Sequence, residues 1–166
     1  MNAIFNRRSI RKYTRQEISE EIMEKLLRAA MAAPSAENEQ PWHFVVIKDK
    51  DILYEITQFH PYSQMLKMAD CAIVVCGDLN LDACKGFWVQ DCSAATENIL
   101  IQATDLGLGA VWLGVYPDMS RVKPLQSLLG LPENVIPLCI VSLGYPTDSR
   151  APADRFNPAR IHKNKW

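Results

Sequence analysis

The sequence has no long apolar run and no excess of charge of either sign. No segment approaches the roughly 18 consecutive apolar residues that a membrane-spanning helix needs. Eighteen lysines and arginines stand against nineteen aspartates and glutamates, so the chain lacks the basic excess typical of nucleic-acid-binding proteins. The charged N-terminal segment does not have the apolar core of a signal peptide. We therefore expect a soluble, cytoplasmic protein with neither a membrane nor a nucleic acid as its partner.

Paired cysteines and clustered histidines are also missing. The five cysteines are an odd number, and none belongs to a CxxC pair. Cys71 and Cys76 lie in one apolar run at a spacing that points them to opposite faces of a strand. The three histidines are spread along the chain, and we expect a structural or surface role for each. The sequence therefore predicts no disulfide framework, no metal site and no Ser-His-Asp constellation.

Hydrophobic periods of helix and strand type alternate along residues 1–166 without an internal repeat, which is typical of a single domain of this length. Ser19 can cap a helix that stops at Pro34, and residues 87–106 keep helical spacing up to Gly107. Two further helices are predicted at residues 49–58 and 120–129, and strands at 43–48, 71–77, 110–116 and 135–143. This mixture predicts an α+β sandwich around a small sheet, with residues 71–77 in its middle.

Residues 145–166 form a distinct C-terminal extension. They contain three prolines, several cations and little periodicity, so they cannot form a core of their own. Phe156, Ile161 and Trp166 are large apolar side chains that gain stability only by docking on another surface. We expect this extension to pack on a partner subunit.

Three short segments carry candidate binding groups. Residues 7–11 read RRSIR, and such guanidinium groups bind phosphate bidentately, although the same cluster also suits a solvated basic patch. Residues 34–42 read PSAENEQPW and place small hydrogen-bonding groups at a helix end, where they form either a site or a simple turn. Residues 107–114 read GLGAVWLG, and a glycine within a strand indicates either close approach of a ligand or a bulge.

The order of these three segments, followed by a basic tail that ends in tryptophan, resembles the nitroreductase family of flavin enzymes, in particular its short members. The resemblance covers nearly the whole chain, and its most specific element is PSAENEQPWHF. It implies a three-layer α+β sandwich in which helices flank a small mixed or antiparallel sheet. It also implies an intertwined homodimer with one FMN in each of two pockets at the subunit interface.

The resemblance also implies which residues bind FMN. Arg7, Arg8 and Ser9 would hold the phosphate and ribityl chain, and Arg11 would reach the N1/O2 edge of the flavin. A cation fixed at that edge stabilises the reduced flavin, which is anionic at N1. The remaining implied contacts are Pro34, Ser35, Ala36 and Asn38 from the partner subunit, backbone N–H groups of Leu113 and Gly114 near N5 and O4, and Arg155 closing on the phosphate. No side chain is assigned as catalytic, because flavin N5 carries the chemistry.

The implied activity is an FMN-dependent oxidoreductase that takes hydride from NADH or NADPH and passes electrons to a nitroaromatic, quinone or similar acceptor in a ping-pong cycle. A second hypothesis is a family relative that catalyses dehalogenation, desaturation or flavin breakdown, or that binds flavin without reductase turnover. A third hypothesis is a regulatory or nucleic-acid-binding module that uses residues 7–12.

Some positions depart from the family pattern. Ala153 stands where longer members often have a lysine, and Trp112 and Leu113 stand where some members have a glutamate. Residues 62–65 read YSQM and stand where longer members use polar residues before the second strand, and Gln64 is a candidate substitute for one of them. No flavin contact requires a carboxylate at Glu37 or Glu39, so we expect both to face solvent.

Overall fold

The computed structural model describes residues 3–166. Its helices are α1 (Ala3–Asn6), α2 (Glu20–Met31), α3 (Lys50–Phe59), α4 (Trp88–Asp105) and α5 (Met119–Leu129), and its strands are β1 (Trp42–Ile47), β2 (Cys71–Asp78), β3 (Gly109–Gly114) and β4 (Val135–Gly144). Short 3-10 turns occur at η1 (Ala36–Asn38), η2 (Gln64–Lys67) and η3 (Pro158–Arg160). The helices and strands expected from periodicity are thus confirmed, most of them with ends within a residue or two.

The four strands form one antiparallel sheet in the order β1-β2-β4-β3. The apolar strand β2 is an inner strand, as its sequence predicts, and all its residues from Cys71 to Gly77 are buried. Pro137 lies within the inner strand β4, opposite Cys76, where the register shifts. Because proline has no N–H to donate, this irregularity lets it occupy an inner strand.

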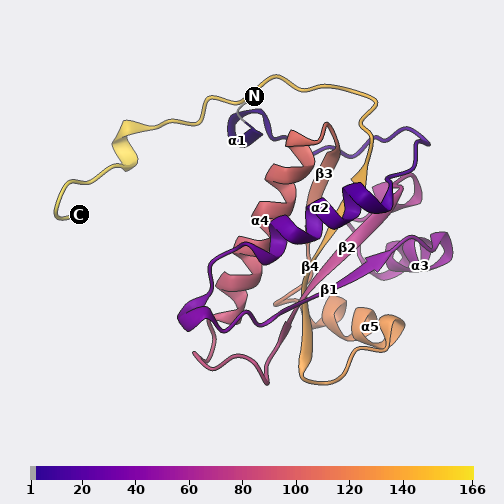
Figure 1. Cartoon of the computed structure of the whole chain (residues 1–166), viewed down its shortest axis with the longest axis horizontal. Helices are drawn as coiled ribbons and strands as arrows, with labels where there is room; N and C mark the ends of the chain where they lie inside the picture. The colour runs from indigo at the N-terminus through magenta and orange to yellow at the C-terminus, as the bar shows by residue number, and fades with distance from the viewer. Residues whose placement is uncertain (1–2) are drawn as a thin grey trace.

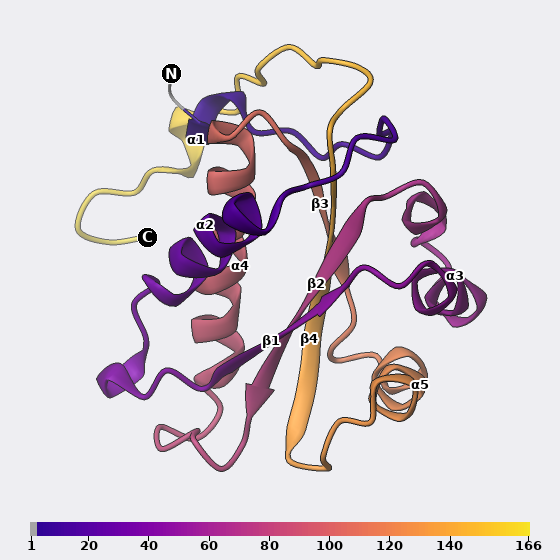
Figure 2. The same cartoon turned by 45° about the vertical axis from the view of Figure 1, so that its right-hand side comes forward.

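Helices cover both faces of the sheet (Figures 1 and 2). One face packs against α2 and α4 in a cluster that includes Leu26, Ile73 and Ile99, and the other packs against α3 and α5. The two cysteines of β2 confirm the two-sided burial, because Cys71 belongs to the first cluster and Cys76 to the second. The expected three-layer α+β sandwich is therefore confirmed.

Local chemistry fixes the ends of α4, the helix along which the candidate site is arranged. Gly107 has φ of 76°, a left-handed conformation that glycine adopts without strain and that ends the helix. At the other end, the Trp88 ring lies against Gly77 so closely that a Cβ there would be 2.3 Å from Trp88 Cε3. Trp88 also packs edge-on against Tyr116, with ring centroids 4.9 Å apart.

The N-terminal segment is attached along β3. Ile10 donates its N–H to the carbonyl of Ala110 at 2.9 Å. Ser9 forms an isolated parallel β-bridge with the same residue. Tyr13 is buried, its hydroxyl lies 3.0 Å from Ser142 Oγ, and burial raises its pKa to about 12. These contacts place the arginines of residues 7–11 beside the strand that carries Leu113 and Gly114.

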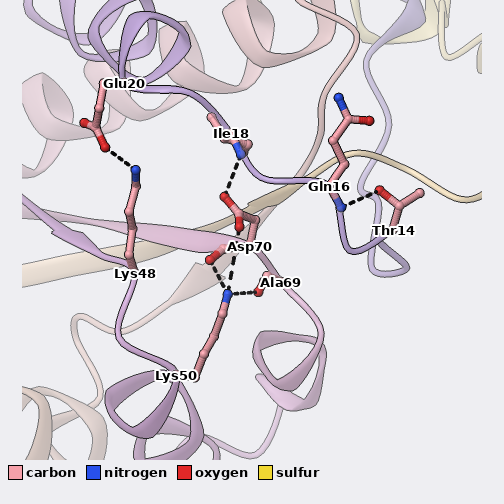
Figure 3. Close-up of polar contacts among 8 residues, drawn as sticks. All are labelled: Thr14, Gln16, Ile18, Glu20, Lys48, Lys50, Ala69 and Asp70. Carbon is pink, nitrogen blue, oxygen red and sulfur yellow. Dashed lines mark hydrogen bonds and ion pairs between the residues drawn. The ribbon is translucent and has the colours of Figure 1, made fainter.

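A polar junction ties this segment to the opposite layer (Figure 3). Asp70 Oδ2 accepts the N–H of Ile18 at 2.9 Å, while Lys50 Nζ donates to the carbonyl of Ala69 at 2.9 Å and to that of Asp70. Lys48 pairs with Glu20 close by. A hollow of about 390 Å³ lies here, but the Lys50 ammonium is already engaged by carbonyl groups, so we interpret the junction as structural.

The C-terminal extension leaves the body of the chain. Tyr145 accepts a backbone hydrogen bond from Thr14, and residues 149–166 are exposed throughout. In Figure 1 the yellow tail runs past α1 and away from the sheet, and the Trp166 side chain is fully exposed. Within residues 3–166, none of the helices is long and apolar enough to span a lipid bilayer.

Candidate functional site

Both ends of the chain contribute arginines to one hollow of about 620 Å³. Arg7 and Arg8 lie there with Arg155, beside the apolar side chains of Ile4 and Phe5. Arg7 Nε is 3.3 Å from Glu97 Oε1 on α4, which fixes the direction of that side chain. Arg8 Nε donates to the carbonyl oxygen of Ala151 at 2.7 Å and so holds the beginning of the tail near the hollow. Asp154 also lines the hollow, so three guanidinium groups stand against one carboxylate, and the net positive charge suits an anion with several oxygens.

A second hollow, of about 430 Å³, brings Arg11 together with Leu113 and Gly114. Among the hydrogen bonds and ion pairs of residues 3–166, none involves the Arg11 guanidinium, and the residue is exposed. Its charge is therefore available to a ligand. Trp112, Tyr62 and Met65 also line this hollow, and they supply flat or flexible apolar surface.

Gly114 presents open backbone to the second hollow. Apart from its chain neighbours, a Cβ at this position would meet no atom of residues 3–166 within 4 Å, so the space that a side chain would fill is free. The Gly114 carbonyl accepts from His60 Nε2 at 2.9 Å and from Arg121 Nη1 at 3.0 Å. The end of β3 is thus held from one side and left bare on the other.

His60 and Arg121 are two residues of this hollow's surroundings that sequence reasoning did not assign to a site. His60 is only 1% exposed, and its pKa lies below the usual range, chiefly because burial disfavours the charged ring. Its Nδ1 atom has no hydrogen-bond partner among residues 3–166. Its burial agrees with the structural role that is one of the two expected from the sequence. No local sequence pattern predicts its contact with Gly114.

The segment that contains Pro34, Ser35, Ala36 and Asn38 lies elsewhere. Ala36 donates its N–H to Asp91 Oδ1 at 3.0 Å, which places the segment at the beginning of α4. In both views η1 lies at the lower end of α4 and α1 lies at its upper end (Figures 1 and 2). Within one chain, therefore, the structure brings Arg7, Arg8 and Arg155 together, and Arg11, Leu113 and Gly114 together, but leaves residues 34–38 apart from both groups.

One expectation about this segment is wrong. Glu37 is exposed as predicted, but Glu39 does not face solvent, because its Oε2 accepts the N–H of Cys84 at 2.8 Å and its Oε1 is buried. The cause is the loop before α4, which folds over the segment. Nothing in the nine letters PSAENEQPW distinguishes the two glutamates.

The chain has relatives among known proteins. A model of the nitroreductase family matches residues 4–60 and 62–145, which together are most of the chain. The chain belongs to the nitroreductase family. A curated protein of Archaeoglobus fulgidus, named "Putative NADH dehydrogenase/NAD(P)H nitroreductase", is 54% identical over 100% of this chain and 98% of its own length.

Solved structures of other members of the nitroreductase family share the fold. A crystal structure of the protein from Parabacteroides distasonis, which carries the same name, superposes with a TM-score of 0.95 at 40% identity and covers 99% of this chain and 96% of that one. An FMN-dependent nitroreductase from Clostridium difficile gives a TM-score of 0.91 at 31% identity and covers 99% of both chains. Membership in the nitroreductase family makes the chain an oxidoreductase, and the resemblance inferred from its motifs is confirmed.

Proposed function

We propose that this nitroreductase-family chain is an FMN-dependent oxidoreductase that uses NADH or NADPH and reduces a nitroaromatic, quinone or similar acceptor in ping-pong order. The observation that carries the proposal is the guanidinium of Arg11, unpaired among residues 3–166, beside the bare backbone of Gly114 in one hollow. The names of the relatives, which include NAD(P)H nitroreductase and FMN-dependent nitroreductase, support the donor and the cofactor.

The residues present fit the phosphate end of FMN. The hollow of about 620 Å³ carries Arg7, Arg8 and Arg155, and guanidinium groups bind phosphate oxygens bidentately. Arg8 is tied to Ala151 through Nε and keeps its terminal nitrogens for an anion, apart from a long contact of 3.4 Å to the Arg7 carbonyl. Ser9, which is held by the backbone bridge to Ala110, would add a hydroxyl near the ribityl chain.

The second hollow, which contains Arg11, fits the ring end of FMN. FMN, when bound, supplies a planar ring that accepts hydride at N5. Gly114 lets such a ring lie directly against the main chain, where the N–H groups of Leu113 and Gly114 are the proposed donors. Arg11 would stabilise negative charge that develops at the neighbouring edge, because a cation close to that charge lowers its energy.

We also propose a cytoplasmic homodimer in which each site is shared. The helix α4 has 18 residues and is about 27 Å long, so one chain cannot readily place both its arginines and its residues 34–38 on one ring. A partner would supply Pro34, Ser35, Ala36 and Asn38. The exposed Phe156, Ile161 and Trp166 of the tail would dock on that partner. The five free cysteines suit a reducing compartment.

A visible spectrum of the purified protein tests the cofactor. We expect flavin absorption that is bleached under anaerobic conditions by NADH or NADPH and that returns when a quinone or nitroaromatic is added. A colourless protein to which FMN gives no thermal stabilisation would contradict the proposal. Bound flavin that neither nucleotide bleaches would instead favour a family relative with another reaction.

A further inference from the structure

Residues 34–40 hold an unusual backbone conformation. Glu37, Asn38 and Gln40 have φ of 44°, 60° and 47°, and positive values are uncommon for residues other than glycine. Asparagine tolerates this region, but glutamate and glutamine do so less readily. Such conformations persist where surrounding contacts fix them, so the contacts that hold this segment matter for its shape.

Two carboxyl groups anchor the segment. Asp91 is 5% exposed, and its Oδ1 accepts the N–H of Ala36 at 3.0 Å. Glu39 reaches the loop before α4, where its Oε2 accepts the N–H of Cys84 at 2.8 Å. The second oxygen of each group, Asp91 Oδ2 and Glu39 Oε1, is buried and has no hydrogen-bond partner among the described residues.

The surroundings contain further acids. Asp82, Glu37 and the thiols of Cys84 and Cys92 are the other titratable groups around the two carboxyls. The Asp82 carboxylate accepts the N–H groups of Gly86 and Trp88 and gives neither Asp91 nor Glu39 a donor. In residues 3–166, no lysine, arginine or histidine forms an ion pair with either of them. Two buried anions side by side without a cation would be strongly unfavourable.

We propose that Asp91 and Glu39 share one proton, which joins Asp91 Oδ2 to Glu39 Oε1 and clamps residues 34–40 to the beginning of α4. Two carboxylate oxygens can hydrogen-bond to each other only when one carries a proton, and a shared proton satisfies both orphaned atoms at once. Burial raises the pKa of Asp91, and a hydrogen bond with the Glu39 carboxyl raises it further, which agrees with this arrangement.

Asp91 and Glu39 are then positioning residues for the segment that, under the proposed function, lines the flavin of the partner subunit. This positioning role rests on the proposed function, whereas the shared proton does not. The pair holds in the folded chain a proton that the unfolded chain has already lost above about pH 4, where free Asp and Glu titrate. Stability should therefore fall as pH rises through the raised pKa.

Thermal unfolding of the full-length protein from about pH 5 to about pH 9 tests the proton, with Glu39→Gln as the variant and Glu37→Gln as its matched control. Both variants replace a carboxyl group with an amide in the same segment, but Glu37 is exposed. An amide at position 39 donates its own N–H to Asp91, so the clamp stays without the proton. The unfolding temperature of Glu39→Gln relative to Glu37→Gln should rise with pH, and parallel curves would overturn the proposal.

Infrared difference spectroscopy provides a direct readout. The wild type and Glu37→Gln should show the band of a protonated carboxyl group at neutral pH, and Glu39→Gln should lack it. If the wild type lacks this band, the two groups are ionised and the proposal is wrong. This measurement requires no flavin, so its result stands whether or not the protein binds FMN.

FMN titration tests the positioning role. Glu39→Ala removes the clamp and should raise the Kd for FMN about tenfold, whereas Glu39→Gln should stay within about twofold of the wild type. Unchanged affinity in Glu39→Ala would contradict the positioning role. A wild type that binds no FMN at all would contradict the proposed function instead.

Discussion

His60 Nε2 lies 2.9 Å from the carbonyl oxygen of Gly114, at the point where β3 ends. The histidine follows α3, and the second donor to the same oxygen, Arg121, belongs to α5. One carbonyl therefore joins two helices of one layer to the strand end that borders the hollow of Arg11. This connection makes the position of the proposed ring contact depend on the α3 and α5 layer.

Replacing His60 tests this connection. We expect His60→Ala to lower the free energy of unfolding by about 2–3 kcal/mol, because it removes a buried ring and leaves the Gly114 carbonyl with one donor fewer. Chemical denaturation at pH 7 measures the loss. A cost below about 0.5 kcal/mol would show that the contact carries little stability.

The same residue predicts a pH dependence. The pKa of His60 is lowered by burial, so below about pH 6.5 the unfolded chain binds a proton that the folded chain resists. Relative to His60→Gln, the wild type should lose stability as pH falls from 7 to 5. The control is His162→Gln in the exposed tail, which should follow the wild type. Equal slopes in the wild type and His60→Gln would contradict the assignment.

Gly114→Ala separates cofactor binding from folding. A Cβ at this position has no close neighbour in the described part of the chain, so the stability measured without FMN should change by less than about 0.5 kcal/mol. The same methyl group would occupy the space proposed for the ring, and we expect the Kd for FMN to rise at least about tenfold. Wild-type affinity would remove Gly114 from the proposed contact.

Gly77→Ala, in contrast to Gly114→Ala, should lower the stability of the fold. Its Cβ would lie 2.3 Å from Trp88 Cε3, so the buried indole or the strand must move. We expect a loss of about 1–3 kcal/mol in the free energy of unfolding, measured by denaturant titration. If Gly77→Ala and Gly114→Ala are equally stable, the packing of Trp88 against β2 is wrong.

Arg11→Ala should affect the flavin without affecting the fold. The guanidinium makes no ion pair with the described residues, so its removal should leave the unfolding temperature unchanged. FMN affinity or the rate of reduction by NAD(P)H should fall, because a cation next to the ring is lost. Lys12→Ala, a neighbouring exposed cation, is the matched control. Wild-type behaviour of Arg11→Ala in both measurements would exclude the proposed role.

Much of this fold follows from the sequence, because each helix and strand has a clear period and recognisable ends. Ser19 accepts the N–H of Ile22 as a cap should, and the spacing of Cys71 and Cys76 correctly assigns them to opposite faces. The residues of the candidate site were predicted from the order of short motifs along the chain. The positions of Glu39 and His60 were not predicted because they depend on partners distant in sequence: the loop that carries Cys84 covers Glu39, and the Gly114 carbonyl binds His60.

The separation of the arginines from residues 34–38 along α4 has a consequence for behaviour in the cell. If two chains complete each site, cofactor retention obeys mass action in the protein itself as well as in FMN. Dilution would then release flavin without any change in a single contact, and the concentration of the enzyme would set the fraction that is active. The expression level would then regulate the active fraction, because the length of α4 separates the two parts of the site within one chain.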